Sequence, residues 1–95
     1  MTAYVIYIRE RTYDQKELDI YANFVGLVLE KFPMQVLAAS GRLEVLEGPA
    51  PESVVIARFP TMDAALAWHH SPEYQAVAQH RLKGASYRGV VVEGL

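Results

Sequence analysis

Two spacings of hydrophobic residues alternate along the chain. Residues 3–9 (AYVIYIR), 53–59 (SVVIARF) and 87–93 (YRGVVVE) are short runs of β-branched and aromatic residues, typical of strands. Residues 14–32 and 61–83 place hydrophobic residues three or four positions apart, which is typical of helices. With residues 35–46 as a further strand, the predicted order is strand, helix, strand, strand, helix, strand.

The predicted strands are apolar on both sides. In the first of them Tyr4, Ile6 and Ile8 alternate with Val5 and Tyr7. Right-handed crossovers place both helices on one face of a four-stranded antiparallel sheet, the ferredoxin-like arrangement. The other apolar face would then be exposed to water. We therefore expect one α+β domain, residues 1–95, that forms a homodimer by packing sheet against sheet.

The first predicted helix is apolar over more than half of its circumference. Asp14 is expected to cap it, with Glu17 completing a capping box, and Pro33 to end it near Phe32. Its main apolar stripe consists of Leu18, Tyr21, Ala22, Val25, Val28, Leu29 and Phe32. An adjoining strip consists of Ile20, Phe24 and Leu27. We expect a second subunit to cover this adjoining strip.

The middle and the second half of the chain contain clear breaks. Gly41 predicts a bulge or bend inside the strand over residues 35–46. Thr61 is a helix start, and Ser71 restarts the helix as a cap followed by Pro72. Gly84 is expected to end the helix. The apolar side of the restarted helix consists of Tyr74, Val77, Ala78 and Leu82.

Composition excludes several classes of function. A net charge of −2 gives no electrostatic reason to expect nucleic acid or an anionic membrane as a partner. No apolar run reaches the length of a membrane span, and no signal peptide is recognised. Because the chain has no cysteine, disulfides and thiolate metal sites are absent. We expect a cytoplasmic protein.

Arg81 is the strongest local anomaly, because it falls in the middle of the apolar side of its predicted helix. A buried guanidinium has to be paired or reach water. One interpretation is a fixed internal partner, such as Glu47 or Glu93, or an extended side chain whose head group reaches solvent. The other is that Arg81 holds an acidic group of a ligand in a cleft between helix and sheet. We favour the first, since buried charges are usually paired.

The three histidines do not predict a metal site. His69 and His70 are adjacent, and neighbouring residues of a helix diverge by about 100°. His80 lies beyond the break at Pro72, and no carboxylate stands at a familiar ligand spacing. We expect a partly packed His69, exposed His70 and His80, no bound metal and no cofactor. A histidine near a pocket could still act as a base.

Aromatic residues are the remaining candidates for a binding site. Trp68, Tyr21 and Tyr74 could line an apolar ligand cavity. Large aromatic side chains more often fill cores and interfaces, and this alternative stays open. Ser71 is explained by its role as a helix cap.

Several motifs resemble the family called domain of unknown function 1330 over nearly the whole chain. The most specific of them is W-x-x-S-P-E-Y-Q, with Arg81 downstream; the others are Leu46-Glu47-Gly48, Val54-Val55-Ile56, Phe59-Pro60 and Val92-Glu93-Gly94. The resemblance implies a dimeric α+β barrel, in which two ferredoxin-like subunits pack sheet to sheet. Relatives in that wider group include cofactor-free monooxygenases. The chain departs from the family pattern at residues 32–35 and at His69-His70, so these positions inherit no family role.

Two classes of function therefore remain. The first is a small dimeric α+β barrel protein without an assignable reaction, whose conspicuous residues are structural. The second is a cofactor-independent enzyme, monooxygenase- or isomerase-like, that acts on a small, partly apolar, acidic compound. In it Arg81 would anchor the acid, and His69 or Glu47 would move a proton. Its walls would be formed by Trp68, Tyr21 and Tyr74.

Overall fold

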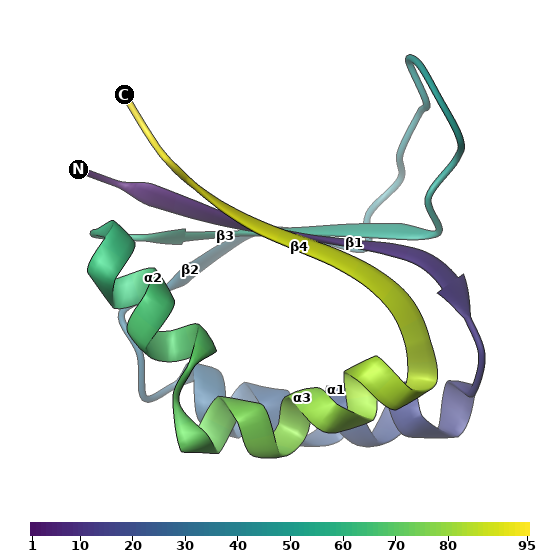
Figure 1. Ribbon diagram of the computed structural model, residues 1–95, viewed down its shortest axis with the longest axis horizontal. Helices are drawn as coiled ribbons and strands as arrows, with labels where there is room; N and C mark the ends of the chain where they lie inside the picture. The colour runs from purple at the N-terminus through teal and green to yellow at the C-terminus, as the bar shows by residue number, and fades with distance from the viewer.

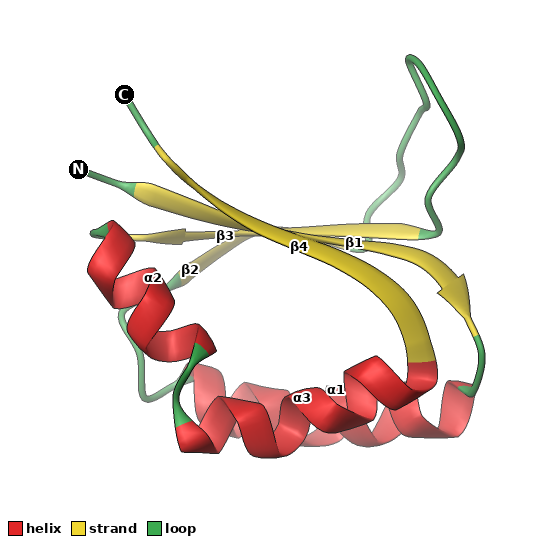
Figure 2. Ribbon diagram, viewed as in Figure 1, coloured by secondary structure: helices red, strands yellow, loops and turns green.

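The computed structural model describes residues 1–95 as a sheet with three helices on one side (Figures 1 and 2). The elements are β1 (Ala3–Thr12), α1 (Gln15–Leu29), β2 (Gln35–Ala39), β3 (Ser53–Phe59), α2 (Met62–His69), α3 (Pro72–Gly84) and β4 (Ala85–Glu93). The strand order is β2-β3-β1-β4, and all neighbours are antiparallel. The predicted ferredoxin-like fold class is confirmed, with the second helix divided at Ser71 into α2 and α3.

Alternate residues of the central strand β1 face opposite sides of the sheet. Val5 and Tyr7 are buried toward the helices, whereas Ile6 faces the other side, as the alternation predicts. Gly89 of β4 pairs with Tyr7, and a Cβ at this glycine would lie 2.7 Å from the Tyr7 ring. The absence of a side chain at position 89 therefore lets the Tyr7 ring pack over β4.

The predicted helix caps are confirmed. Asp14 accepts a hydrogen bond from the backbone N–H of Lys16, and Ser71 accepts one from that of Tyr74. Thr61 caps α2 in the same way. The expected capping box is wrong in one part, because the Glu17 carboxylate contacts His80 Nδ1 at 2.6 Å. α1 also ends at Leu29, earlier than expected from Pro33.

The strand expected over residues 35–46 is too long. β2 ends at Ala39, and residues 40–52 form a loop that rises from the sheet on the side away from the helices (Figure 1). Ser40 turns the chain with a φ of 56°, which ends the pairing with β3. The register shift in β2 lies between Val36 and Ala38 instead of at Gly41. Leu82, expected on the apolar side of α3, is 57% exposed.

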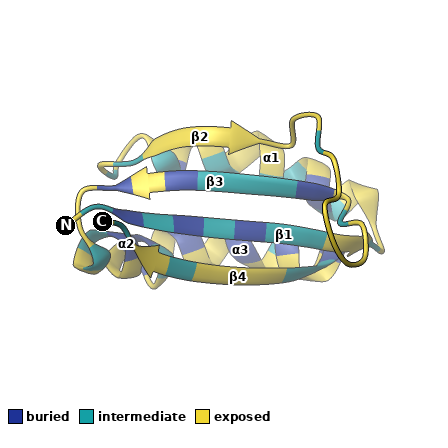
Figure 3. Ribbon diagram, turned by 90° about the horizontal axis from the view of Figure 1, so that it is seen from above, coloured by how far each residue is buried: buried dark blue, intermediate teal, exposed yellow.

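The face of the sheet without helices carries a continuous apolar area, here called the open sheet face. Figure 3 looks onto this face, with the helices behind the sheet. It consists of Tyr4, Ile6, Ile8, Val54, Ile56, Val90 and Val92 on the three strands β1, β3 and β4. Arg58 and Arg88 lie at its margins, held by Gln35 and Glu10. On α1, Phe24 and Leu27 are also 53% and 63% exposed, so cover by a second subunit stays a prediction. None of the helices combines the length and apolar character required to cross a membrane.

Candidate functional site

A cavity of about 380 Å³ lies between α1 and the helix-side face of the sheet. Of its 19 lining residues, 14 are hydrophobic, which makes it suitable for an apolar ligand body. One part is formed by Val25 and Leu29 of α1 together with Met34 and Val36. The polar lining residues include Arg81 and Arg9.

Arg81 is buried in this wall with only 5% of its surface exposed. Its Cζ lies 4.3 Å from the centre of the Tyr7 ring and 4.7 Å from that of Tyr87. No carboxylate forms an ion pair with it, and its Nε has no hydrogen-bond partner. The expected internal partner is therefore wrong. Glu47 lies in the exposed loop after β2, and Glu93 is exposed at the end of β4.

The position of Arg81 follows from helical spacing. Tyr74, Ala78 and Arg81 are all buried, three or four residues apart on α3. The side chain is therefore directed to the interior by the same stripe that anchors the helix. Two tyrosine rings offset part of the desolvation cost through cation–π contacts, each worth up to about 2 kcal/mol when desolvated. The guanidinium N–H groups remain without an anion.

Four side chains with polar tips form two pairs, and one member of each pair, Tyr7 or Tyr21, lines the cavity. The hydroxyls of Tyr21 and Tyr74 lie 2.9 Å apart. The hydroxyl of Tyr7 lies 2.7 Å from Nδ1 of His69. Burial raises the pKa of both Tyr7 and Tyr21, and the nearby Tyr74 adds to the effect. Tyr7 and Tyr21 therefore stay protonated at neutral pH and act as hydrogen-bonding phenols.

His69 stands at the end of α2, outside the Arg81 cavity. It lines a second hollow of about 270 Å³ between α2 and the strands β1 and β4. Val5 and Tyr7 line both hollows and separate them. Burial lowers the pKa of His69, and the neighbouring His70 and Arg81 lower it further. His69 is thus neutral near pH 7, and its hydrogen bond to Tyr7 links it to the cavity wall.

The structure brings together three of the residues predicted for a ligand site. Arg81, Trp68 and Tyr21 all line the cavity, and the Nε1 of Trp68 is buried without a hydrogen-bond partner. Tyr74 is fully buried one layer behind, with its ring centre 4.1 Å from that of Trp68. Glu47 does not reach the cavity, so nothing in the geometry supports it as a catalytic group.

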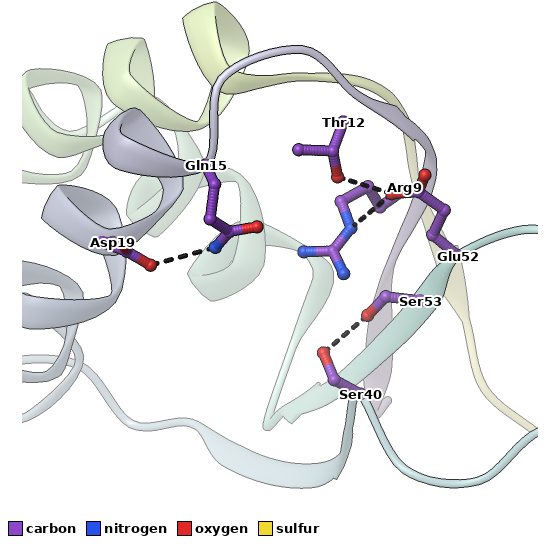
Figure 4. A network of polar contacts seen from close by, with 7 residues as sticks. All are labelled: Arg9, Thr12, Gln15, Asp19, Ser40, Glu52 and Ser53. Carbon is purple, nitrogen blue, oxygen red and sulfur yellow. Dashed lines mark hydrogen bonds and ion pairs between the residues drawn. The ribbon is translucent and has the colours of Figure 1, made fainter.

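A second arginine at the cavity, Arg9, was not predicted. Figure 4 shows its guanidinium between Gln15 of α1 and the Ser40–Ser53 pair at the ends of β2 and β3. Its Nε lies 3.2 Å from a carboxylate oxygen of Glu52, without the alignment of a hydrogen bond. The alternation along β1 could have predicted its position, because Arg9 lies two residues after the buried Tyr7 and therefore faces the same side of the sheet.

Metal ligands do not converge anywhere in the chain. No group of three histidine, aspartate or glutamate side chains is close enough to hold one ion. His80 contacts Glu17, and His70 is exposed.

Solved structures with this fold come from several bacteria. A protein of unknown function from Rhodopseudomonas palustris is 20% identical, with a TM-score of 0.73 over 99% of this chain and 82% of the other. A dimeric ferredoxin-like protein of unknown function from Jannaschia is 10% identical, with a TM-score of 0.77 over 99% and 100%. SnoaB, a cofactor-independent oxygenase from Streptomyces nogalater, is 8% identical, with a TM-score of 0.59 over 99% and 92%. At these identities the likeness shows the fold alone.

Sequence comparison gives the family. No curated protein is similar enough in sequence to match. The family described as Domain of unknown function (DUF1330) matches residues 2–95, which is nearly the whole chain. The protein therefore belongs to the DUF1330 family.

Proposed function

We propose that this protein is a homodimer in which each subunit binds a small, partly apolar carboxylic acid, with Arg81 as the anchor. The observation that carries this proposal is a guanidinium that is buried, faces a cavity and has no anionic partner. An unpaired buried charge is costly. A ligand carboxylate would supply the missing anion.

The surroundings of Arg81 favour a carboxylate in particular. Tyr7 and Tyr87 pack on the guanidinium, which leaves its N–H edge available to the cavity. A planar carboxylate can accept two parallel hydrogen bonds from such an edge. The largely hydrophobic lining then suits the rest of the molecule. Both halves of the proposed ligand thus have a counterpart in the cavity.

The dimer is supported by the open sheet face. Its apolar side chains lie on three adjacent strands and have no helix to cover them. Structures of the same fold from Jannaschia, Bacteroides fragilis and Thermobifida fusca are described as dimeric. Sedimentation in dilute solution is expected to show a dimer of the 10.7 kDa chain. A species of 10.7 kDa alone would contradict the proposal.

Ligand binding can be measured directly, because Trp68 is the only tryptophan and lines the cavity. Titration with octanoate is expected to change its fluorescence. In Arg81→Met, which keeps an unbranched apolar stem and removes the guanidinium, affinity should fall at least about tenfold. Arg42→Met is the matched control, since Arg42 lies in the exposed loop. Equal affinity of the Arg81→Met protein and the wild type would refute the role of Arg81.

A second candidate function is a cofactor-independent enzyme, and one observation favours it. Neutral His69 is hydrogen-bonded to Tyr7, which lines the Arg81 cavity. A proton could pass between a bound acid and His69 through this hydroxyl. SnoaB offers a distant example of a cofactor-independent oxygenase on the same fold. Acids recovered unchanged after incubation with the protein and air, by mass spectrometry, would speak against this candidate.

The cytoplasmic location also remains a proposal. It is supported by a cysteine-free composition, which gives no sign of an oxidising compartment. Fractionation of the producing cells is the check, and recovery of the protein outside the cytoplasm would contradict it.

A further inference from the structure

The guanidinium groups of Arg81 and Arg9 line the same cavity, but only that of Arg9 has a carboxylate nearby. Arg81 has no carboxylate within ion-pair distance. Arg9 has Glu52 at 3.2 Å from its Nε. A hydrogen bond from Thr12 holds the pKa of Glu52 below its ordinary value, and Arg9 contributes to this effect. Glu52 is thus an anion at neutral pH, and the charge of Arg9 is already balanced.

Tyr87 connects the surroundings of the two arginines. Arg9 pairs with Tyr87 in the β1–β4 register, and the Tyr87 ring packs on Arg81. All three residues line the cavity. A ligand head group held by Arg81 therefore lies beside the Arg9 end of the cavity, with Tyr87 as the shared wall.

Other polar side chains gather around Arg9 (Figure 4). Gln15 donates to Asp19 at 2.9 Å, and the hydroxyls of Ser40 and Ser53 lie 2.5 Å apart. Asp19 and Ser40 also line the cavity. A second anion placed here would meet the Asp19 carboxylate and an arginine whose charge is already balanced, and like charges repel. A neutral acceptor suits this end better, since Arg9 and Ser40 can donate to it.

We propose that the acid bound in this cavity is an oxo acid, in which a carbonyl oxygen near the carboxylate is recognised by Arg9. The inference rests on the proposed function and specifies its ligand class. The carboxylate is held by Arg81, and the hydrocarbon chain extends along Val25, Leu29 and Met34, away from Arg9. The cavity is thus polar at the end where the arginines lie and apolar at the other.

Four probes of one chain length test the proposal by Trp68 fluorescence. They are octanoate, α-oxooctanoate, γ-oxooctanoate and hexylmalonate, which carries a second carboxylate in place of the α-oxo group. One of the two oxo acids should bind about tenfold more tightly than octanoate, as expected for one hydrogen bond to a charged donor. Hexylmalonate should bind more weakly than α-oxooctanoate. Equal affinities of octanoate and both oxo acids would overturn the oxo acid proposal.

Variants separate this proposal from the one on which it rests. In Arg9→Met the ratio of oxo acid affinity to octanoate affinity should fall to about one. Both acids are expected to bind more weakly, because Glu52 loses the cation that balances it. Arg11→Met is the matched control on the same strand, because Arg11 is exposed and does not line the cavity. A preference that persists in Arg9→Met overturns the role of Arg9 even if octanoate binds as proposed.

A further variant covers the case in which Arg9→Met fails to fold. Asp19→Asn keeps Arg9 and its ion pair and removes the repelling carboxylate, so hexylmalonate should bind several-fold more tightly. No gain would contradict the charge argument. If none of the four acids binds to the wild type, the proposed function fails together with the inference.

Discussion

The two faces of the sheet are both apolar, but they differ in the polar groups that they leave without partners. On the helix side, Nε of Arg81 and Nε1 of Trp68 are buried and make no hydrogen bond. On the open sheet face, the flanking charges Arg58 and Arg88 are exposed and held by neighbours. Apolar surface without unsatisfied polar atoms is suited to a second copy of the chain. Apolar surface around an unpaired cation is suited to a specific anion.

The largest effect is expected from a charge placed on the open sheet face. Ile6 is at its centre, paired with Ile56 and Val90. Ile6→Asp would bury a carboxylate without a partner in the proposed dimer, which costs several kcal/mol. Sedimentation equilibrium should show the monomer at concentrations where the wild type is dimeric. Asn23→Asp adds the same charge to the exposed side of α1 and should leave the dimer intact.

The second largest effect is expected from removing the unpaired cation, Arg81. Arg81→Met removes a buried charge and keeps most of the side-chain volume, so it should raise the free energy of unfolding by about 1–4 kcal/mol. Urea unfolding measures this change. Arg42→Met, at the exposed loop, should stay within about 0.5 kcal/mol of the wild type. A destabilised Arg81→Met protein would show that Arg81 stabilises the fold. The helix side would then no longer differ from the open sheet face by a costly unpaired cation.

A third, smaller effect is expected at the wall of the cavity. In Gly89→Ala, the added methyl group would collide with the Tyr7 ring, which should cost about 1–3 kcal/mol. Gly26→Ala is the matched control, because nothing lies within 4 Å of a Cβ at this helical position. The control should gain about 0.5–1 kcal/mol from helix propensity. Thermal unfolding of the two proteins should therefore shift in opposite directions.

The smallest effect is a pH dependence from His69. Its pKa is depressed from 6.5 in the folded protein, mainly by burial, so the unfolded chain binds a proton more readily. The contribution of His69 to stability is therefore present above its unfolded pKa and lost as the pH falls from about 6.5. Melting temperatures from pH 5 to 8 should show a weaker acid decline in His69→Asn than in the wild type. Identical curves would contradict this assignment.

Local sequence signals predicted most of the fold. Asp14, Thr61 and Ser71 act as helix caps because each needs only its own neighbouring backbone N–H groups. The bounds of β3 and the two faces of β1 followed from short-range patterns in the same way. The early end of β2 was missed because the pairing of an edge strand depends on a turn at Ser40, a residue type that rarely adopts positive φ.

The candidate site was predicted only in part, because it depends on long-range neighbours. The burial of Arg81 followed from its helical position, but its surroundings did not. Tyr7 and Tyr87 come from two strands whose register no local pattern reveals. Arg9 was missed because its contacts, Glu52 and the cavity, lie far along the chain. Glu47 was a poor candidate since residues 40–52 form a loop directed away from the helices.

One carbonyl fixes the geometry of the cavity at its polar end. Gly84, the last residue of α3, accepts hydrogen bonds from the N–H groups of Tyr13 at 2.7 Å and Asp14 at 3.0 Å, immediately before α1. α1 and α3 are therefore joined at this end, and the Glu17–His80 and Tyr21–Tyr74 contacts hold them together further along α1. Any widening of the space beneath the sheet has to come from the far end of α1, near Leu29 and Met34. Bulky substitutions there would change the rates of entry and release of the proposed ligand more than its contacts with Arg81.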